Sequence, residues 1–383
     1  MKLNDQNLSR REIERHSGDL AAAGGVRKVV LDDGSERGIR VLEFRTGSGL
    51  TFEVLSDRAL DIGAAEYKGH SLGWHSATGF RHPGLHENAD EHGLSWLRSF
   101  SGLQVTAGLD HTLGAEEVPA TEYKYPSRPS MIHSLHGRVA NIPARLNGYG
   151  ETWNGEQCLL WAEGEVRQAA VFGEHLRLHR RIETRIGSKE ILVHDTVRNF
   201  GFDRTPHMFL YHINLGWPLI DAGTRFFAPI IGTRWQSPTV ATQRSSYQVM
   251  PGPSPGFLEQ AYEHDLKPDS AGRMYVAVIN ERLKIGLTME WYAAEFPSFF
   301  QWLHLREGAY AMGIEPSTHH MEGDMNARKD GCMIWLEHGE CRSYRFVLTV
   351  LDGQEALESA VERIRRVAVQ PDCDVPPLTR VNS

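Results

Sequence analysis

Three short segments, far apart in the chain, carry the side chains best suited to proton transfer. His136 lies in the sequence SLHGR, His212 in YHINLG and Glu315 in GIEPS. Each segment sets one ionisable group in an apolar run that we expect to be strand-like. Two imidazoles and one carboxylate can move protons in both directions near neutral pH. The set therefore suits acid–base chemistry on a small polyhydroxylated molecule.

The glutamate and the second histidine stand in sequences typical of buried strands. Glu315 follows a largely apolar run and precedes Pro316, which favours an extended backbone at the glutamate. Partial desolvation there would raise its pKa toward that of a general base, whereas a glutamate facing water is the alternative. His212 and Asn214 share one strand face, because side chains alternate along a strand. Two polar side chains on one face of an apolar strand indicate a polar pocket. The alternative is a core histidine with satisfied hydrogen bonds.

The first histidine is followed by Gly137 and Arg138. Glycine allows another backbone or a ligand to approach closely. We expect His136 and Arg138 to share a strand face, where the guanidinium can donate two parallel hydrogen bonds to neighbouring oxygens. A surface turn is the alternative. Tryptophans beside polar segments, among them Trp302, can stack on the apolar faces of sugar rings, and core packing is the alternative for each.

Composition excludes several classes of partner. The chain has 383 residues and a formal charge of −8, with 49 acidic and 41 basic residues and no basic run, so we expect no nucleic-acid partner. We expect no membrane partner, because no stretch approaches the roughly 18 apolar residues of a membrane helix. The polar N-terminus lacks the apolar core of a secretion signal. Four cysteines without C-x-x-C spacing indicate free thiols in the cytoplasm.

Short alternating runs, separated by turn residues, predict a strand-rich fold. Leu50–Val54 alternates at period two, and residues 29–31 with 39–42, and 182–186 with 191–197, are typical of hairpins. The segment 344–350 predicts a further strand. The 37 glycines and 18 prolines fit many turns between strands. We expect an all-β fold, a large antiparallel β-sandwich formed by one domain over residues 1–383.

Helical signal is sparse. Apolar residues recur at helical spacing over residues 352–369, where Asp352 and Glu355 resemble a capping box. Asn7–His16 predicts a shorter helix. Residues 81–92 and 116–129 are expected to be long loops, which often line binding sites on a β scaffold.

Motifs for other chemistries are absent or weak. The chain has no Walker loop, no G-x-G-x-x-G and no G-x-S-x-G, so nucleotide cofactors and serine hydrolysis find no support. Nineteen histidines raise the possibility of a metal, but the pairs His82/His86, His133/His136 and His319/His320 lack a recognised ligand motif. We expect neither a metal nor a cofactor.

The order of these segments resembles the aldose 1-epimerase (galactose mutarotase-like) superfamily, and more closely an uncharacterised branch of it. The resemblance rests on a histidine before glycine, a histidine in Tyr-His-x-Asn and a glutamate in Gly-Ile-Glu. It spans roughly residues 25 to 350. The matching patterns are SDRALDI at 56–62, GLQVTAGLD at 102–110, HGR at 136–138, LYHIN at 210–214 and GIEPS at 313–317.

The resemblance implies a β-supersandwich with a C-terminal helix, and mutarotation without a cofactor. Glu315 matches the base that takes the proton of the anomeric hydroxyl. His212 matches the general acid that protonates the ring oxygen, and His136 matches the second histidine at that oxygen. Arg138, Asn214 and Trp302 are further candidates for substrate contact. The partner is then a small sugar, and both a monomer and a homodimer remain open.

The sequence departs from the family pattern at two places. The family has a substrate-binding arginine upstream of the first histidine, for which Arg58 and Arg98 are both candidates. Its substrate-binding aspartate has no match here, since Asp221 and Asp265 lack the context. A non-enzymatic carbohydrate-binding protein, another sugar or sugar-acid epimerase, and a metal-assisted sugar-acid isomerase therefore remain alternatives.

Overall fold

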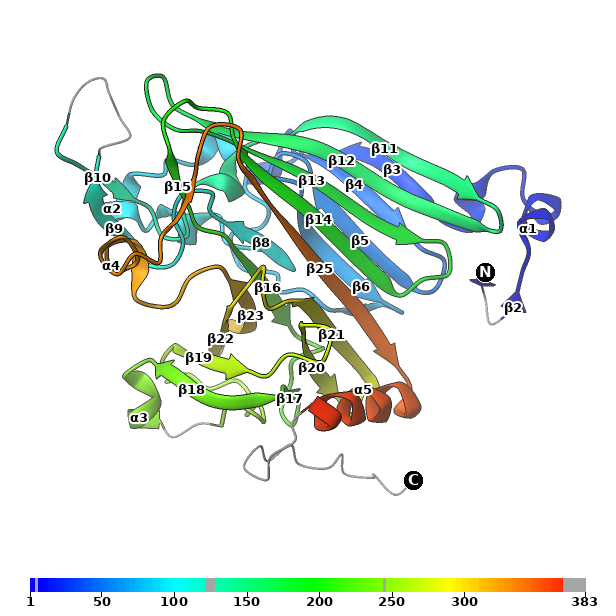
Figure 1. Cartoon of the computed structure of the whole chain (residues 1–383). Helices are drawn as coiled ribbons and strands as arrows, with labels where there is room; N and C mark the ends of the chain where they lie inside the picture. Colours follow the sequence, from blue (N-terminus) through cyan, green and yellow to red (C-terminus); the bar gives the residue numbers. More distant parts are fainter. Residues whose placement is uncertain (4–5, 121–127, 244–245, 368–383) are drawn as a thin grey trace.

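The computed structural model describes residues 1–3, 6–120, 128–243 and 246–367. Antiparallel strands dominate, and most of them fall into three sheets (Figure 1). The largest sheet has eight strands. Their order across the sheet is β11 (Arg145–Asn154), β12 (Gln157–Ala169), β13 (His175–Arg185), β14 (Glu190–Asn199), β25 (Cys341–Asp352), β21 (Ile285–Tyr292), β20 (Arg273–Asn280) and β17 (Arg225–Phe227).

The second sheet has six strands and carries the segments of His212 and Glu315. Strand β16 is buried along its whole length and β23 along all but its first two residues, which explains their apolar runs. The order is β18 (Ile230–Gln236), β19 (Gln260–Leu266), β22 (Ser298–Arg306), β23 (Ala309–Ser317), β16 (Leu210–Gly216) and β8 (Gln104–Ala107).

The third sheet is a meander near the N-terminus, and the expected hairpin at residues 29–42 belongs to it. It contains β3 (Gly25–Val30), β4 (Arg40–Arg45), β5 (Leu50–Leu55), β6 (Asp61–Tyr67) and β7 (His70–Ser71). The remaining strands form three two-stranded ladders. They are β1 (Lys2–Leu3) with β2 (Gln6–Asn7), β9 (Glu116–Pro119) with β10 (Ser130–His133), and β15 (Thr205–His207) with β24 (Ile334–Leu336).

The helices are short except for the last. The α-helices are α1 (Arg10–His16), α2 (Asp90–Gly93), α3 (Thr239–Gln243), α4 (Gly323–Lys329) and α5 (Gln354–Val367), and the 3-10 helices are η1 (Leu20–Ala22), η2 (Gly34–Glu36), η3 (Pro83–Leu85), η4 (Ser95–Arg98) and η5 (Val139–Asn141). The expected C-terminal helix is confirmed, and its apolar side packs on β20, β25 and β17. None of the helices in the described part of the chain has the length and apolar character needed to cross a bilayer.

Two local expectations were wrong. Asp352 does not cap α5, because its carboxylate accepts hydrogen bonds from Tyr67, Lys68 and Lys189 instead. Residues 116–129 do not form a plain loop, since Glu116–Pro119 pairs with Ser130–His133 and residues 121–127 lie outside the described part. The partners of Asp352 are distant in the chain, so the sequence does not show them, whereas the pairing of Glu116–Pro119 with the nearby Ser130–His133 was missed.

A buried ionic network holds the three sheets together. Arg180 of β13 is fully buried, and its guanidinium donates to both carboxylate oxygens of Asp195, at 2.9 and 2.6 Å, and to Asp61 at 2.6 Å. Tyr211 of β16 donates to Asp195, and Thr106 of β8 donates to Asp61. The inner face of the eight-stranded sheet is thereby bonded to the other two sheets. The network lies on the face of β16 opposite to His212, since Tyr211 and His212 are adjacent.

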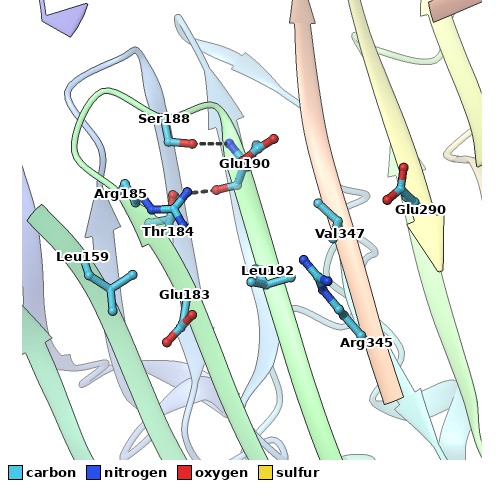
Figure 2. A pocket seen from close by; sticks show the side chains of 10 residues that line it. All are labelled: Leu159, Glu183, Thr184, Arg185, Ser188, Glu190, Leu192, Glu290, Arg345 and Val347. Atoms are coloured by element: carbon cyan, nitrogen blue, oxygen red, sulfur yellow. Dashed lines mark hydrogen bonds between the residues drawn. The ribbon is translucent and has the colours of Figure 1, made fainter. Parts of the chain in front are cut away.

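The outer face of the eight-stranded sheet carries a shallow polar hollow of about 190 Å³ over β12, β13, β14, β25 and β21 (Figure 2). Glu183, Glu290 and Arg345 are among the charged residues that line it. None of His136, His212 and Glu315 contributes to this hollow. It is therefore separate from the site predicted from the sequence.

Candidate active site

Neighbouring strands place His212 opposite Glu315. In the β16–β23 ladder Leu210 pairs with Ser317 and Ile213 with Ile314, so the register sets His212 across from Glu315 on one face of the sheet. Nε2 of His212 lies 3.2 Å from Oε1 of Glu315. The orientation of the two groups does not make a hydrogen bond, so Oε1 is left without a partner. The contact is short enough for a proton to pass after a small rotation.

His136 reaches the same place from a turn, not from the strand that we expected. Its φ is 59° and that of Gly137 is 73°, so the chain reverses tightly there. The backbone N–H of His136 donates to the carbonyl of Leu113 at 2.8 Å, and that of Gly137 donates to the carbonyl of Ser134 at 2.9 Å. The ring centroids of His136 and His212 lie 5.3 Å apart and nearly perpendicular. The structure thus brings the three predicted residues together.

Aromatic side chains surround the two imidazoles. The ring of Trp96 lies 4.6 Å from that of His136, and Phe100 lies 4.8 Å from His212. Trp302, which is half-buried, lies 5.5 Å from His212 and 6.1 Å from the half-buried Trp74. Such walls offer apolar faces for a sugar ring, and they remove water from the ionisable groups.

Burial sets the protonation of all three groups. It raises the pKa of Glu315 well above its ordinary value, and the charge of Glu259 acts in the same direction. It lowers the pKa of His212 to about 3, although the Asn214 side chain opposes the shift. Burial, followed by the charge of His212, also lowers the pKa of His136 well below its usual value. Burial therefore favours the protonated carboxyl of Glu315 and the neutral imidazoles of His136 and His212.

Several polar atoms of the site have no hydrogen-bond partner. They include Nδ1 of His136, Nδ1 of His212 and Oε1 of Glu315, all shielded from solvent. Buried polar atoms are nearly always paired in folded proteins, so unpaired ones mark a place for a polar ligand or water. Gly313 keeps this place open, because a Cβ there would lie 2.4 Å from Oε1 of Glu315 and 3.1 Å from Cε1 of His212.

The other predicted contact residues differ in position. Asn214 is buried beside His212, where its amide donates to the carbonyls of Gly102 and His212, each at 3.1 Å, and its Oδ1 has no partner. Trp302 forms part of the aromatic wall. Arg138 is half-buried just after the His136 turn. These three remain candidates for substrate contact.

Arg58 and Arg98, the two candidate arginines upstream of His136, make their contacts elsewhere. Arg58 is buried and donates to the carbonyls of Ala140, Arg81 and Ser99, so it ties together the loops that carry the aromatic wall. Arg98 is exposed on η4 and pairs with Glu91 at 2.6 Å. Neither makes a described contact with the three central residues, so a role for either in substrate binding stays a prediction.

The histidine pairs considered as metal ligands do not converge. His86 contacts Ser99 and Asn88, whereas Nδ1 of His82 accepts from the backbone of Gly84. His320 pairs with Glu263. Within the described ranges, no three histidine, cysteine, aspartate or glutamate side chains gather closely enough to hold a metal ion.

Sequence reasoning missed a second buried cluster beside His136. It consists of Asp110, His111 and His133, which are at most 3% exposed. The available signal was the position of Asp110 at the end of the GLQVTAGLD pattern, which was quoted for the resemblance but given no role.

The sequence comparison identifies a family. Residues 36–350 match the family described as Domain of unknown function (DUF4432). The chain belongs to this family. No curated protein matches it.

Solved structures show the fold of this DUF4432 protein to be galactose mutarotase-like. A protein from Klebsiella pneumoniae subsp. pneumoniae, assigned provisionally as an aldose 1-epimerase, superposes with a TM-score of 0.82 at 22% identity, over 94% of this chain and 91% of that chain. A galactose mutarotase-like protein from Clostridium acetobutylicum superposes with a TM-score of 0.57 at 11% identity, over 85% of this chain and 98% of that chain. Galactose 1-epimerase from Lactobacillus acidophilus superposes with a TM-score of 0.51 at 12% identity, over 86% of this chain and 99% of that chain. The all-β supersandwich with a C-terminal helix is confirmed.

Proposed function

We propose that this protein is an aldose 1-epimerase-like enzyme, which interconverts the anomers of a sugar by acid–base catalysis. One observation carries the proposal. A carboxyl and an imidazole lie 3.2 Å apart, and a second imidazole lies beside them in an aromatic-walled site whose polar atoms lack partners. A lectin needs hydrogen bonds and aromatic faces, but it does not need a buried proton-transfer pair.

In the proposed reaction, Glu315 takes the proton of the anomeric hydroxyl while His212 gives a proton to the ring oxygen. The bond from C1 to the ring oxygen breaks, and the open-chain aldehyde forms. His136 holds the ring oxygen from its other side. Rotation about the C1–C2 bond turns the carbonyl, and reclosure with the two proton transfers reversed delivers the other anomer. Protons and charges balance, and the protein returns to its initial state.

The protonation favoured by burial fits one half of this cycle. After ring opening, Glu315 holds a proton and His212 is neutral, which is the distribution that desolvation favours. The cyclic sugar requires the opposite distribution. Its anomeric hydroxyl must donate to a Glu315 carboxylate, and its ring oxygen must accept from a charged His212. These hydrogen bonds offset the cost of the buried ion pair.

The proposal is tested by anomer exchange, followed by NMR on a panel of aldoses. We expect the wild type to accelerate exchange of at least one aldose, and Glu315→Gln to lower that rate by about 100-fold or more, because a general base is lost. Glu263→Gln is the matched control. Glu263 is as buried on nearby β19, but Ser298 and His320 already bond it. Full activity of Glu315→Gln contradicts the mechanism, and saturable binding without acceleration indicates a carbohydrate-binding protein.

A further inference from the structure

The side-chain amide of Asn214, on the same strand as His212, is only half used in hydrogen bonding. Its Nδ2 donates to the carbonyls of Gly102 and His212, each at 3.1 Å. A carbonyl oxygen can only accept, so the amide atom that faces both must be the nitrogen, which fixes the orientation of the amide. Oδ1 is the atom left over. It is buried, and no group in the described part of the chain donates to it with hydrogen-bond geometry.

Two other buried asparagines show the complete form of this arrangement. Asn199 on β14 and Asn280 on β20 each donate the amide nitrogen to two backbone carbonyls, as Asn214 does. In both, Oδ1 also accepts a backbone N–H, from Gly201 in the first and from Leu283 in the second. Asn214 has the two donated bonds without the accepted one. Because buried acceptors are nearly always paired, its Oδ1 calls for a donor.

The imidazole of His212 is placed to be that donor. His212 and Asn214 lie on the same face of β16, because side chains alternate along a strand. Nε2 of the ring faces Oε1 of Glu315 at 3.2 Å, whereas Nδ1 is buried and has no hydrogen-bond partner among the described residues. A Cβ on Gly313 would lie 3.1 Å from Cε1 of the ring, and Gly313 pairs with Asn214 in the β16–β23 ladder. The ring therefore leans along the sheet toward Asn214.

The electrostatic effect of the amide identifies which of its atoms faces the ring. Burial lowers the pKa of His212 to about 3, and the Asn214 side chain acts in the opposite direction. An acceptor beside an imidazole N–H favours the charged ring and raises its pKa, whereas an amide N–H would disfavour the charged ring. Oδ1 is therefore the atom that faces the ring. The two groups interact without the alignment of a full hydrogen bond, which a small rotation of the imidazole would complete.

Resting on the proposed function, we infer that Asn214 is a positioning residue, whose Oδ1 accepts the Nδ1–H of His212 and so makes Nε2 the nitrogen that exchanges a proton with the sugar. A neutral imidazole has one N–H, so a proton held at Nδ1 leaves a lone pair at Nε2. With the cyclic sugar bound, Nε2 carries the proton that passes to the ring oxygen, and Nδ1 keeps its own throughout. An uncharged amide orients the ring without stabilising the imidazolium as a carboxylate would, so the imidazolium stays a strong acid.

The tautomer of His212 is measured by long-range proton–nitrogen NMR of the histidine rings at neutral pH, without any sugar. The signals of His212 are those that disappear in His212→Gln. We expect a single tautomer with the proton on Nδ1 in the wild type, and a mixture of both tautomers in Asn214→Ala. Asn280→Ala is the matched control, because Asn280 makes the same two donated bonds far from the site, so it should leave the His212 signals unchanged. A proton on Nε2 in the wild type, or an unchanged tautomer in Asn214→Ala, overturns the inference.

Asn214→Asp gives a second measurement if Asn214→Ala does not fold. A carboxylate beside Nδ1–H should raise the pKa of His212 by about one unit or more in an NMR titration, and no rise overturns the inference.

Kinetics separate positioning from substrate contact. On an aldose whose exchange is accelerated, we expect Asn214→Ala to lower kcat by about 10- to 100-fold and to leave KM within about twofold, because the amide acts through His212. A raised KM with unchanged kcat indicates a contact with the sugar and overturns the inference. If the tautomer results are as expected but no aldose exchanges faster, only the proposed function fails. If exchange is accelerated while the proton lies on Nε2 in the empty wild type, only the role of Asn214 fails.

Discussion

In the proposed reaction, the Glu315–His212 pair determines how the rate of anomer exchange should respond to pH. Burial lowers the pKa of His212 to about 3 and raises that of Glu315, so the pair keeps one proton across the neutral range. Acid inactivation requires a second proton, and that proton binds only well below the usual histidine pKa of about 6.5. We expect kcat/KM to stay within about twofold from about pH 7 to about pH 5, as measured by anomer exchange in non-catalytic buffers. An acid limb centred near 6.5 contradicts this assignment.

Gly313 is expected to be intolerant of a side chain because of crowding, and not because of its backbone conformation. Its backbone is extended, so alanine adds no conformational strain, but the new Cβ would crowd Oε1 of Glu315, Cε1 of His212 and Cβ of Trp302. We expect Gly313→Ala to lower kcat/KM by about 10- to 100-fold through misplacement of the pair. The crowding should also cost about 1–3 kcal/mol in urea unfolding. Gly232→Ala on β18 is the control, since the nearest atom to its Cβ is 3.8 Å away. Equal activity of the two variants contradicts the role of Gly313.

At the level of elements, the turn that presents His136 depends on Gly137. This glycine has a φ of 73°, and a Cβ would lie 2.4 Å from the carbonyl oxygen of Gly108. We expect Gly137→Ala to cost about 1–3 kcal/mol of stability in urea unfolding and to abolish anomer exchange, because the turn must open. Gly155→Ala is the matched control. Gly155 has a φ of 58° in the β11–β12 turn with open space around it, so its variant should keep full activity.

Elements whose partners are close in the chain were predictable. The hairpins at residues 29–42 and 182–197 and the helix ending at His16 follow local rules, and Ser9 with Glu12 forms a capping box at the start of that helix. The His136 turn was not predictable, because its shape comes from contacts with Gly108 and Leu113. Local sequence resembled a strand, and tertiary contacts overrode it.

At the level of the whole molecule, Arg180 should be the buried charged residue whose substitution lowers stability most. Arg180→Met leaves Asp61 and Asp195 buried without their cation, so we expect a loss of about 3–5 kcal/mol in urea unfolding. Arg177→Met is the control on the outer face of the same strand. Its partially exposed pair with Glu165 should contribute less than about 1 kcal/mol. Similar losses for the two variants contradict the role of the network.

The central site was predictable only in part. The sequence indicated which two imidazoles and which carboxylate to group, since each interrupts an apolar run, and the structure places them in contact. It could not separate Arg58 from Arg98, because carbonyl partners and exposure depend on tertiary structure. No role was predicted for Asp110 for the same reason, since several of its neighbours come from other segments of the chain.

Strand pairing also has a consequence for the order of biosynthesis. The two histidines are synthesised before Glu315, which belongs to β23 and pairs with β16 although the two strands are roughly a hundred residues apart. The large sheet closes later still, when β25 joins β14. A nascent chain must therefore keep the β23-facing edge of β16 and the β25-facing edge of β14 unpaired until these later strands have been made. The proposed proton-transfer pair forms only after β23 has been synthesised, so a nascent chain that has not reached Glu315 lacks it.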